Sequence, residues 1–203
     1  MKTAFFVVFL VYLFVSDPPF SSAAEAPKPV LDTAKKSVRT GTRYFIFSVF
    51  PRTGGLTLES LEKPCPLSIV QEDNLGYSVS FSPINPKKGV VRVSTDLNVE
   101  FNVPTNCSSS TWWNIDISPS TGNYFLSTGG SQGNPGPNTV RNWFKIEQDG
   151  QQQTGGNLYK FVYCPTFSKT TCKNVGIVVQ NGKRRLGLTN VPLQFVLKQS
   201  EMV

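Results

Sequence analysis

The segment Asn142-Trp143-Phe144-Lys145-Ile146 resembles the later segment Leu193-Gln194-Phe195-Val196-Leu197, and each comes last in a series of short strand-like segments. Phe144 and Phe195 take the same place in the two segments, and so do Ile146 and Leu197. Self-similarity at a regular interval is typical of a fold built from repeated units. The likeness, although weak, therefore predicts a chain divided into equivalent parts.

Twelve strand-like segments fall into three sets of four, each about 50–60 residues long, and none keeps the apolar period of a helix. Turn residues separate them, and Asn181-Gly182 gives the strongest hairpin signal. Three four-stranded units predict a single all-β domain, a β-trefoil, in which a closed six-stranded barrel is capped by three hairpins. A β-sandwich is the alternative. The expected strands are 44–50, 56–60, 67–71, 79–82, 97–101, 112–116, 124–128, 143–148, 159–164, 176–180, 185–189 and 194–198.

Residues 1–24 have the order of a secretory signal peptide. Lys2 gives a basic start, residues 4–15 form an uncharged apolar run, and small residues at 22–24 offer a cleavage site. The run is too short for a membrane span. We therefore expect a mature chain of residues 25–203 that is secreted, extracellular or vacuolar, with no membrane partner.

Four cysteines in an exported chain predict two disulfides, and their spacing leaves all three pairings open. The chain has no histidine, which excludes Ser-His-Asp and Cys-His catalysis and disfavours a zinc site. Its only adjacent acids, Glu72 and Asp73, have the sequence context of a solvated turn. We therefore expect neither an enzyme, nor a metal, nor a cofactor.

The formal net charge is +7, but the cations are scattered along the chain. Scattered charge favours a soluble surface over a nucleic-acid interface, so no nucleic acid partner is expected. The run Lys183-Arg184-Arg185 beside the Asn181-Gly182 turn is interpreted in the same way, as a solvated hairpin.

A string of motifs spans the mature chain in a characteristic order: PVLD at 29–32, GTRYFI at 41–46, CPLSIVQ at 65–71, VRVSTDLNV at 91–99, NPGP at 134–137, WFKIE at 143–147, YKFVYCP at 159–165 and RRL at 184–186. In these motifs the chain resembles the plant Kunitz-type trypsin inhibitor family, and most of all its miraculin-like members. The resemblance implies a β-trefoil, a monomer, and disulfides Cys65–Cys107 and Cys164–Cys172.

The resemblance also implies an inhibitor whose protein partner is a serine endopeptidase. Such inhibitors present a rigid, substrate-like loop. Most of the conformational entropy of the loop is therefore lost during folding and not during binding. In this chain the corresponding reactive loop follows the fourth strand, and its residues are Ile84, Asn85, Pro86, Lys87, Lys88 and Gly89.

The loop departs from the inhibitory pattern at its specificity position. Asn85 stands where a trypsin-like target requires Arg or Lys, and Pro86 follows it. The loop is longer than the family's usual one, so Lys87 or Lys88 could take that role. The asparagine with which the family braces this loop is replaced by Thr40, whose hydroxyl cannot donate two amide hydrogens.

Two further features bear on binding and modification. Trp112 and Trp113 are adjacent on an expected strand, so one side chain should enter the core while the other faces outward. Asn106-Cys107-Ser108 matches the N-glycosylation pattern.

Three functions follow from these features. The first is inhibition of trypsin-like serine endopeptidases in plant defence. The second is a non-inhibitory binding, taste-active or storage role on the same fold, motivated by Asn85, Pro86 and Thr40. The third is glycan binding through an exposed tryptophan.

Overall fold

The computed structural model describes residues 26–86, 89–107, 110–151 and 156–201. The expected signal peptide, residues 1–24, lies outside the described residues. In the described part of the chain no helix is long and apolar enough to cross a membrane.

All twelve expected strands are confirmed, with boundaries that differ by a few residues at most. They are β1 Tyr44–Phe50, β2 Gly54–Glu59, β3 Ser68–Glu72, β4 Ser78–Pro83, β5 Leu97–Phe101, β6 Asn114–Ile117, β7 Tyr124–Ser127, β8 Lys145–Gln151, β9 Asn157–Tyr163, β10 Lys173–Gln180, β11 Lys183–Thr189 and β12 Gln194–Gln199, with the short 3-10 helix η2 Val140–Asn142 ahead of β8.

Six of these strands close a barrel. β1 pairs with β4, β4 with β5, β8 with β9, β9 with β12, and β12 with β1. The ring is completed between β5 and β8, where Leu97 forms an isolated bridge with Phe144 just before β8 begins. Each unit of the chain supplies two barrel strands, which is the β-trefoil arrangement that the repeats predict.

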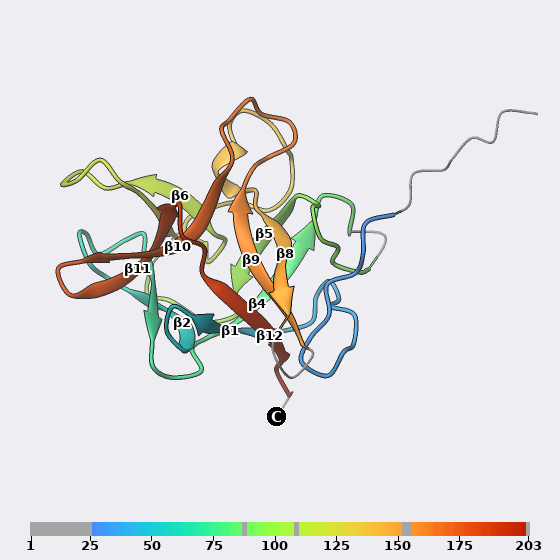
Figure 1. The fold of residues 1–203 in the computed structure, drawn as a ribbon. Coiled ribbons are helices and arrows are strands. Elements are labelled where there is room, and N and C mark those ends of the chain that lie inside the picture. Colours follow the sequence, from blue (N-terminus) through green and yellow to red (C-terminus); the bar gives the residue numbers. More distant parts are fainter. Residues whose placement is uncertain (1–25, 87–88, 108–109, 152–155, 202–203) are drawn as a thin grey trace, which may run out of the picture.

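The other six strands form three hairpins that cap the barrel, β2–β3, β6–β7 and β10–β11. Their second strands β3, β7 and β11 pair with one another in a triangle. Figure 1 shows these hairpins on the left and the barrel strands to their right. In the β10–β11 hairpin Asn181 and Gly182 both have positive φ, at 50° and 75°, and this is the turn that the Asn-Gly signal predicts.

Aromatic side chains fill the middle of the barrel. Trp113 is fully buried. Its ring centroid lies 5.1 Å from that of Phe161, 5.8 Å from that of Phe144 and 5.9 Å from that of Phe101. Trp112 is half-buried and forms a bridge with Glu100. The expected alternation is confirmed, so Trp113 belongs to the core and offers no surface for a sugar.

Two disulfides lie outside the barrel strands. Cys65 in the β2–β3 connection is bonded to Cys107, between β5 and β6, and Cys164 is bonded to Cys172 across the β9–β10 connection. These are the pairings that the resemblance implies.

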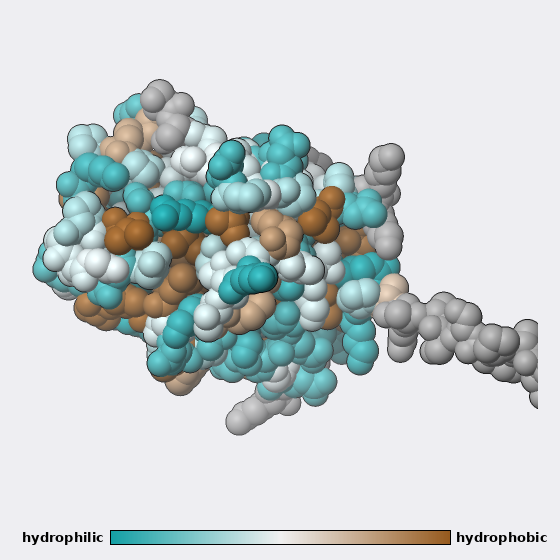
Figure 2. All heavy atoms as spheres, turned by 90° about the horizontal axis from the view of Figure 1, so that it is seen from above, coloured by the Kyte–Doolittle hydropathy of each residue, from teal (hydrophilic) through white to brown (hydrophobic). Residues whose placement is uncertain are grey.

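The outer surface is mixed in polarity. Seen from above, apolar residues gather toward the side of the cap hairpins, with polar loops around them (Figure 2). The large hydrophobic side chains exposed in this part of the fold include Ile117, Tyr124, Val179 and Val191.

Candidate functional site

The loop expected to contact a protease leaves the barrel at the end of β4. Pro83, the last residue of β4, is paired with Leu97 at the start of β5. Ile84, Asn85 and Pro86 are exposed, and the side chain of Ile84 is 41% exposed although it is apolar. Lys87 and Lys88 lie outside the described residues. The described part of the loop is thus a projection from a rigid barrel strand.

Main-chain hydrogen bonds hold this loop at both ends. The amide of Ile84 donates to the carbonyl of Asp96 at 2.8 Å, and the amide of Gly89 donates to the carbonyl of Pro86 at 3.0 Å. Gly89 has φ of 62°, a left-handed conformation that costs a glycine little. Ile84 is thus bonded to Asp96 at the start of the loop, and Gly89 at its end is bonded back to Pro86.

Thr40 lies against the returning end of the loop. Its amide donates to the carbonyl of Gly89 at 3.3 Å, and the neighbouring Arg39 bridges Val90. Its hydroxyl oxygen is buried and has no hydrogen-bond partner among the described residues. Thr40 thus supports the loop with its main chain, and no side-chain bond from it to the described loop residues is present.

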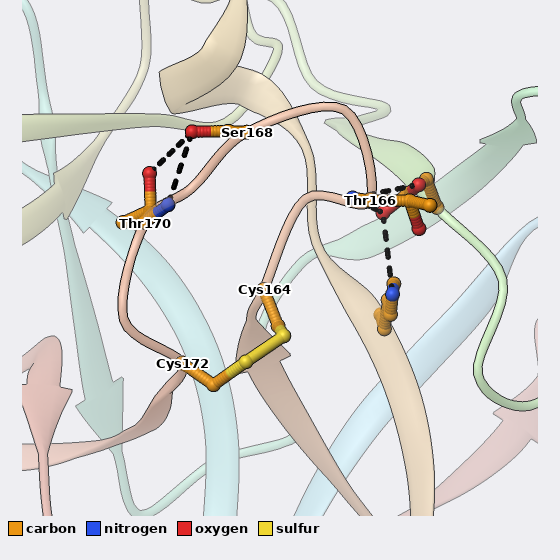
Figure 3. Close-up of a disulfide and its surroundings, with 7 residues drawn as sticks. Cys164, Thr166, Ser168, Thr170 and Cys172 are labelled. Atoms are coloured by element: carbon orange, nitrogen blue, oxygen red, sulfur yellow. Dashed lines mark hydrogen bonds and ion pairs between the residues drawn. A yellow bond between two sulfur atoms is a disulfide. The ribbon is translucent and has the colours of Figure 1, made fainter.

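Asp96 joins the loop to the segment closed by Cys164–Cys172. Its carbonyl accepts the Ile84 amide, while its carboxylate oxygens lie 3.3 and 3.2 Å from the amide nitrogen of Thr166, which donates to them. Figure 3 shows Thr166 and its bond to the carboxylate beside the disulfide. Lys145 of β8 lies 3.9 Å from the same carboxylate, which is almost fully buried.

Sequence reasoning missed this role of Asp96, although the residue stands within the VRVSTDLNV motif. Its partners Ile84, Lys145 and Thr166 come from three separate parts of the chain, and no local spacing links them. The structure thus brings together the loop and a buried acid whose position could be known only from the fold.

Asp96→Asn is expected to lower the free energy of unfolding by about 1.5 kcal/mol, because the half-buried amine of Lys145 loses its charged partner and the Thr166 amide is left with a weaker, uncharged acceptor. Urea denaturation measures the change. Asp73→Asn is the matched control, because Asp73 is mostly exposed in its ion pair with Arg52 and should change stability by under about 0.5 kcal/mol. An equal decrease in the free energy of unfolding in the two variants would contradict a stabilising role of the Asp96 contacts.

Comparison with known proteins identifies this architecture. The Kunitz legume family model, described as trypsin and protease inhibitor, matches residues 30–199. The chain belongs to this Kunitz family. It is 41% identical to miraculin from Synsepalum dulcificum, over 96% of this chain and 94% of miraculin. It is also 38% identical to Kunitz trypsin inhibitor 5 from Arabidopsis thaliana, over 98% of this chain and all of that protein.

Solved structures of Kunitz proteins superpose on the chain. The Kunitz-type cysteine protease inhibitor from potato is 28% identical and covers 88% of this chain and all of its own, with a TM-score of 0.75. The rice bifunctional α-amylase/subtilisin inhibitor is 31% identical and covers 86% of this chain and all of its own, with a TM-score of 0.67. Proteins named for different targets therefore share this fold.

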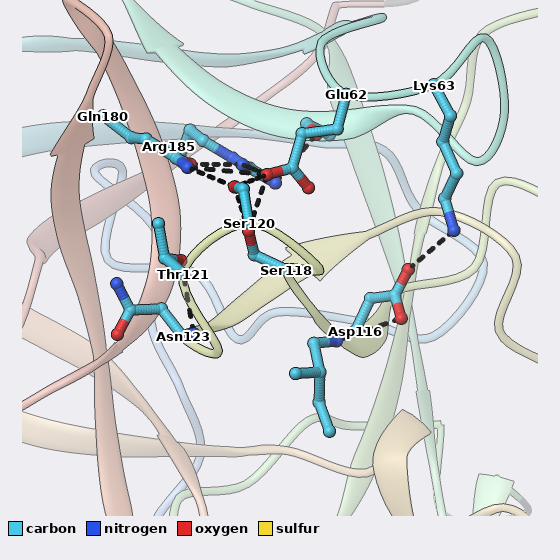
Figure 4. Close-up of polar contacts among 11 residues, drawn as sticks. Glu62, Lys63, Asp116, Ser118, Ser120, Thr121, Asn123, Gln180 and Arg185 are labelled. Carbon is cyan, nitrogen blue, oxygen red and sulfur yellow. Dashed lines mark hydrogen bonds and ion pairs between the residues drawn. The ribbon is translucent and has the colours of Figure 1, made fainter.

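A second polar cluster of this Kunitz chain lies among the three cap hairpins (Figure 4). The Glu62 carboxylate, from the β2–β3 connection, accepts hydrogen bonds from Ser118 at 2.5 Å and Ser120 at 2.8 Å, both from the β6–β7 connection. The Arg185 guanidinium, from the β10–β11 hairpin, lies 3.5 Å from the same carboxylate. The cluster thus links the β2–β3 and β6–β7 connections to strand β11 of the third hairpin.

Arg185 corrects the interpretation of Lys183-Arg184-Arg185 as a solvated hairpin. Its side chain is only 6% exposed and lies over the ring of Phe125, 3.7 Å from the ring centroid. The Ser118 hydroxyl, assisted by Ser120 and the charge of Arg185, holds the pKa of Glu62 below its ordinary value. Arg185 and Ser118 are buried while Glu62 and Ser120 reach the surface, and each of the four has a partner within the cluster, so we assign the cluster to stability rather than to binding.

The remaining residues singled out in the sequence lie apart from the loop. Asn106 is exposed next to the Cys65–Cys107 disulfide, and Ser108, which completes its glycosylation pattern, lies outside the described residues. No group of three or more Cys, Asp or Glu in the described ranges could hold a metal ion.

Proposed function

We propose that the chain is a secreted Kunitz-type inhibitor of trypsin-like serine endopeptidases that acts through the loop of residues 84–89. The observation that carries the proposal is the exposed loop held at both ends by Asp96 and Thr40. A loop fixed before binding loses little conformational entropy when it enters a protease cleft. The names of its relatives, which include trypsin inhibitors, favour the same target class.

Chemistry at the specificity position favours one of the two lysines. Asn85 carries no charge for the buried carboxylate of a trypsin-like pocket, whereas Lys87 and Lys88 each carry one. Pro86 restricts the backbone before them and donates no amide hydrogen. The proposal therefore assigns the primary contact to Lys87 or Lys88 and a supporting part to Ile84, Asn85, Pro86 and Gly89.

Lys87→Ala or Lys88→Ala is expected to weaken trypsin inhibition about tenfold or more, which corresponds to about 1.4 kcal/mol. Titration of trypsin, chymotrypsin and subtilisin with the mature protein measures the residual activity. Lys198→Ala, an exposed lysine on β12, is the matched control and should leave the titration unchanged. Unchanged inhibition in both loop variants would remove these lysines from the contact.

A second candidate function is a non-inhibitory binding, taste-active or storage role. The uncharged Asn85 and the following Pro86 favour it. So do the Thr40 hydroxyl, which has no partner among the described residues, and the similarity to miraculin. If the intact protein inhibits none of the three proteases, this second function replaces the first.

Secretion is part of the proposal. Cleavage before Glu25 would keep the described contacts of the amino-terminal segment with the fold, which begin at Pro27, whose carbonyl accepts a hydrogen bond from Arg92. Amino-terminal sequencing of the protein recovered from the secretory pathway should therefore read Glu25-Ala26-Pro27.

A further inference from the structure

A groove of about 590 Å³ lies outside the inhibitory loop, at the edge of the cap hairpins. Several separate segments form it: β6, the start of β7, the residue Arg141 of η2, the end of the Cys164–Cys172 loop, and the two ends of the β10–β11 hairpin. Its volume is in the range of small-molecule sites in proteins. None of the described loop residues, Ile84, Asn85, Pro86 and Gly89, lines it.

The groove has an apolar floor and one exposed aromatic wall. Ile115 is buried beneath it, Leu188 is half-buried, and Tyr124 at its side is a residue with 48% of its surface exposed. A tyrosine ring that is half open to solvent offers an apolar face on which the C–H side of a sugar ring can stack.

Hydroxyl and amide groups line the rest of the groove. They come from Thr170, Thr171, Thr189 and Asn190, and from Tyr163, whose phenol lies next to Thr170. Burial raises the pKa of Tyr163, so its hydroxyl stays protonated at neutral pH and can donate. Such groups suit a ligand with many hydroxyls better than an apolar one.

Two cations give the groove its charge. Arg141 and Lys173 are both exposed, and neither forms an ion pair with another described residue. No Asp or Glu is among the residues that line the groove. Arg can bind a carboxylate through two parallel hydrogen bonds, and Lys adds a second positive charge.

From these groups we infer that the groove binds a carboxylated saccharide, an oligosaccharide that contains uronic acid. Its sugar ring stacks on Tyr124, its hydroxyls bond to the threonines and Asn190, and its carboxylate lies between Arg141 and Lys173. An acidic peptide would use the cations but leave the row of hydroxyl groups largely unmatched. A neutral saccharide would leave the two cations without a partner.

Isothermal titration of the mature protein with trigalacturonate tests the inference, with maltotriose as the neutral sugar and citrate as the carboxylate without a sugar ring. Trigalacturonate should bind about tenfold more tightly than either. Arg141→Gln combined with Lys173→Gln should weaken its binding about tenfold, and Tyr124→Ala about fivefold. All three residues are exposed, so the variants should fold.

Lys28→Gln combined with Lys198→Gln is the matched control, because it removes the same charge from exposed positions outside the groove and should leave binding unchanged. The inference would be overturned if trigalacturonate did not bind, or if citrate or maltotriose bound equally well. It would also be overturned if the control and groove variants lost the same affinity for trigalacturonate. Titration of trypsin with the same variants measures inhibition by the loop of residues 84–89, and does so independently of saccharide binding in the groove.

Discussion

Cys65→Ser combined with Cys107→Ser is expected to lower the free energy of unfolding of the mature chain by about 4 kcal/mol. The bond joins residues 42 positions apart, and without it the unfolded chain regains the entropy of that long loop. Guanidinium denaturation with linear extrapolation measures the change. The loss is a large part of the roughly 5–15 kcal/mol that holds an ordinary domain together.

The second disulfide supplies the control. Cys164 and Cys172 are only 8 positions apart, so the same model gives about 2.5 kcal/mol for Cys164→Ser with Cys172→Ser. The ordering of the two losses is the critical result. A larger loss from the short loop would show that the Cys164–Cys172 bond acts mainly in the folded state, through the segment that Thr166 fixes to Asp96.

Arg185→Ala is expected to cost about 2 kcal/mol of stability, because it removes a buried side chain, opens a space over Phe125 and leaves Ser68 and Gln180 without their hydrogen-bond donor. Urea denaturation at neutral pH measures it. Lys183→Ala is the matched control, since its ion pair with Glu59 is close to half exposed and should contribute under about 1 kcal/mol.

Acid supplies a further check on this cluster. The pKa of Glu62 is lowered in the folded protein, so its stabilising effect is complete above the ordinary value of about 4.5 and disappears as the pH falls through the lowered value. The difference in stability between the native protein and Arg185→Ala should therefore narrow in strong acid. A difference that stays constant with pH would assign the loss to packing on Phe125 alone.

The strands could be predicted from local signals. Turn residues such as Asn181-Gly182 mark where each strand ends, and strand alternation correctly separates buried Trp113 from half-buried Trp112. The β-trefoil followed because the units recur, and because the family motifs extend over nearly the whole chain. The fold was therefore predictable from the chain itself, with the family resemblance adding the disulfide pairs.

The contacts across the fold could not be predicted in this way. Three adjacent cations beside a hairpin turn have the pattern of a solvated surface. Only the packing of β11 against the β2–β3 connection places Glu62 against Arg185. In the same way, the Asp96 carboxylate accepts a hydrogen bond from the amide of Thr166, which lies seventy positions later in the sequence. Burial of a charge depends on partners from other repeats, which a local pattern does not contain.

The pairing of the first strand with the last has a consequence for biosynthesis. β1 pairs with β12 over most of its length, so its edge stays open until residues 194–199 have left the ribosome. The barrel can close only after β12 has been made, and until then the growing chain exposes unpaired strand edges. A chain that stops before β12 would therefore leave β1 and β9 with open edges, and we expect an aggregation-prone product rather than a shortened barrel.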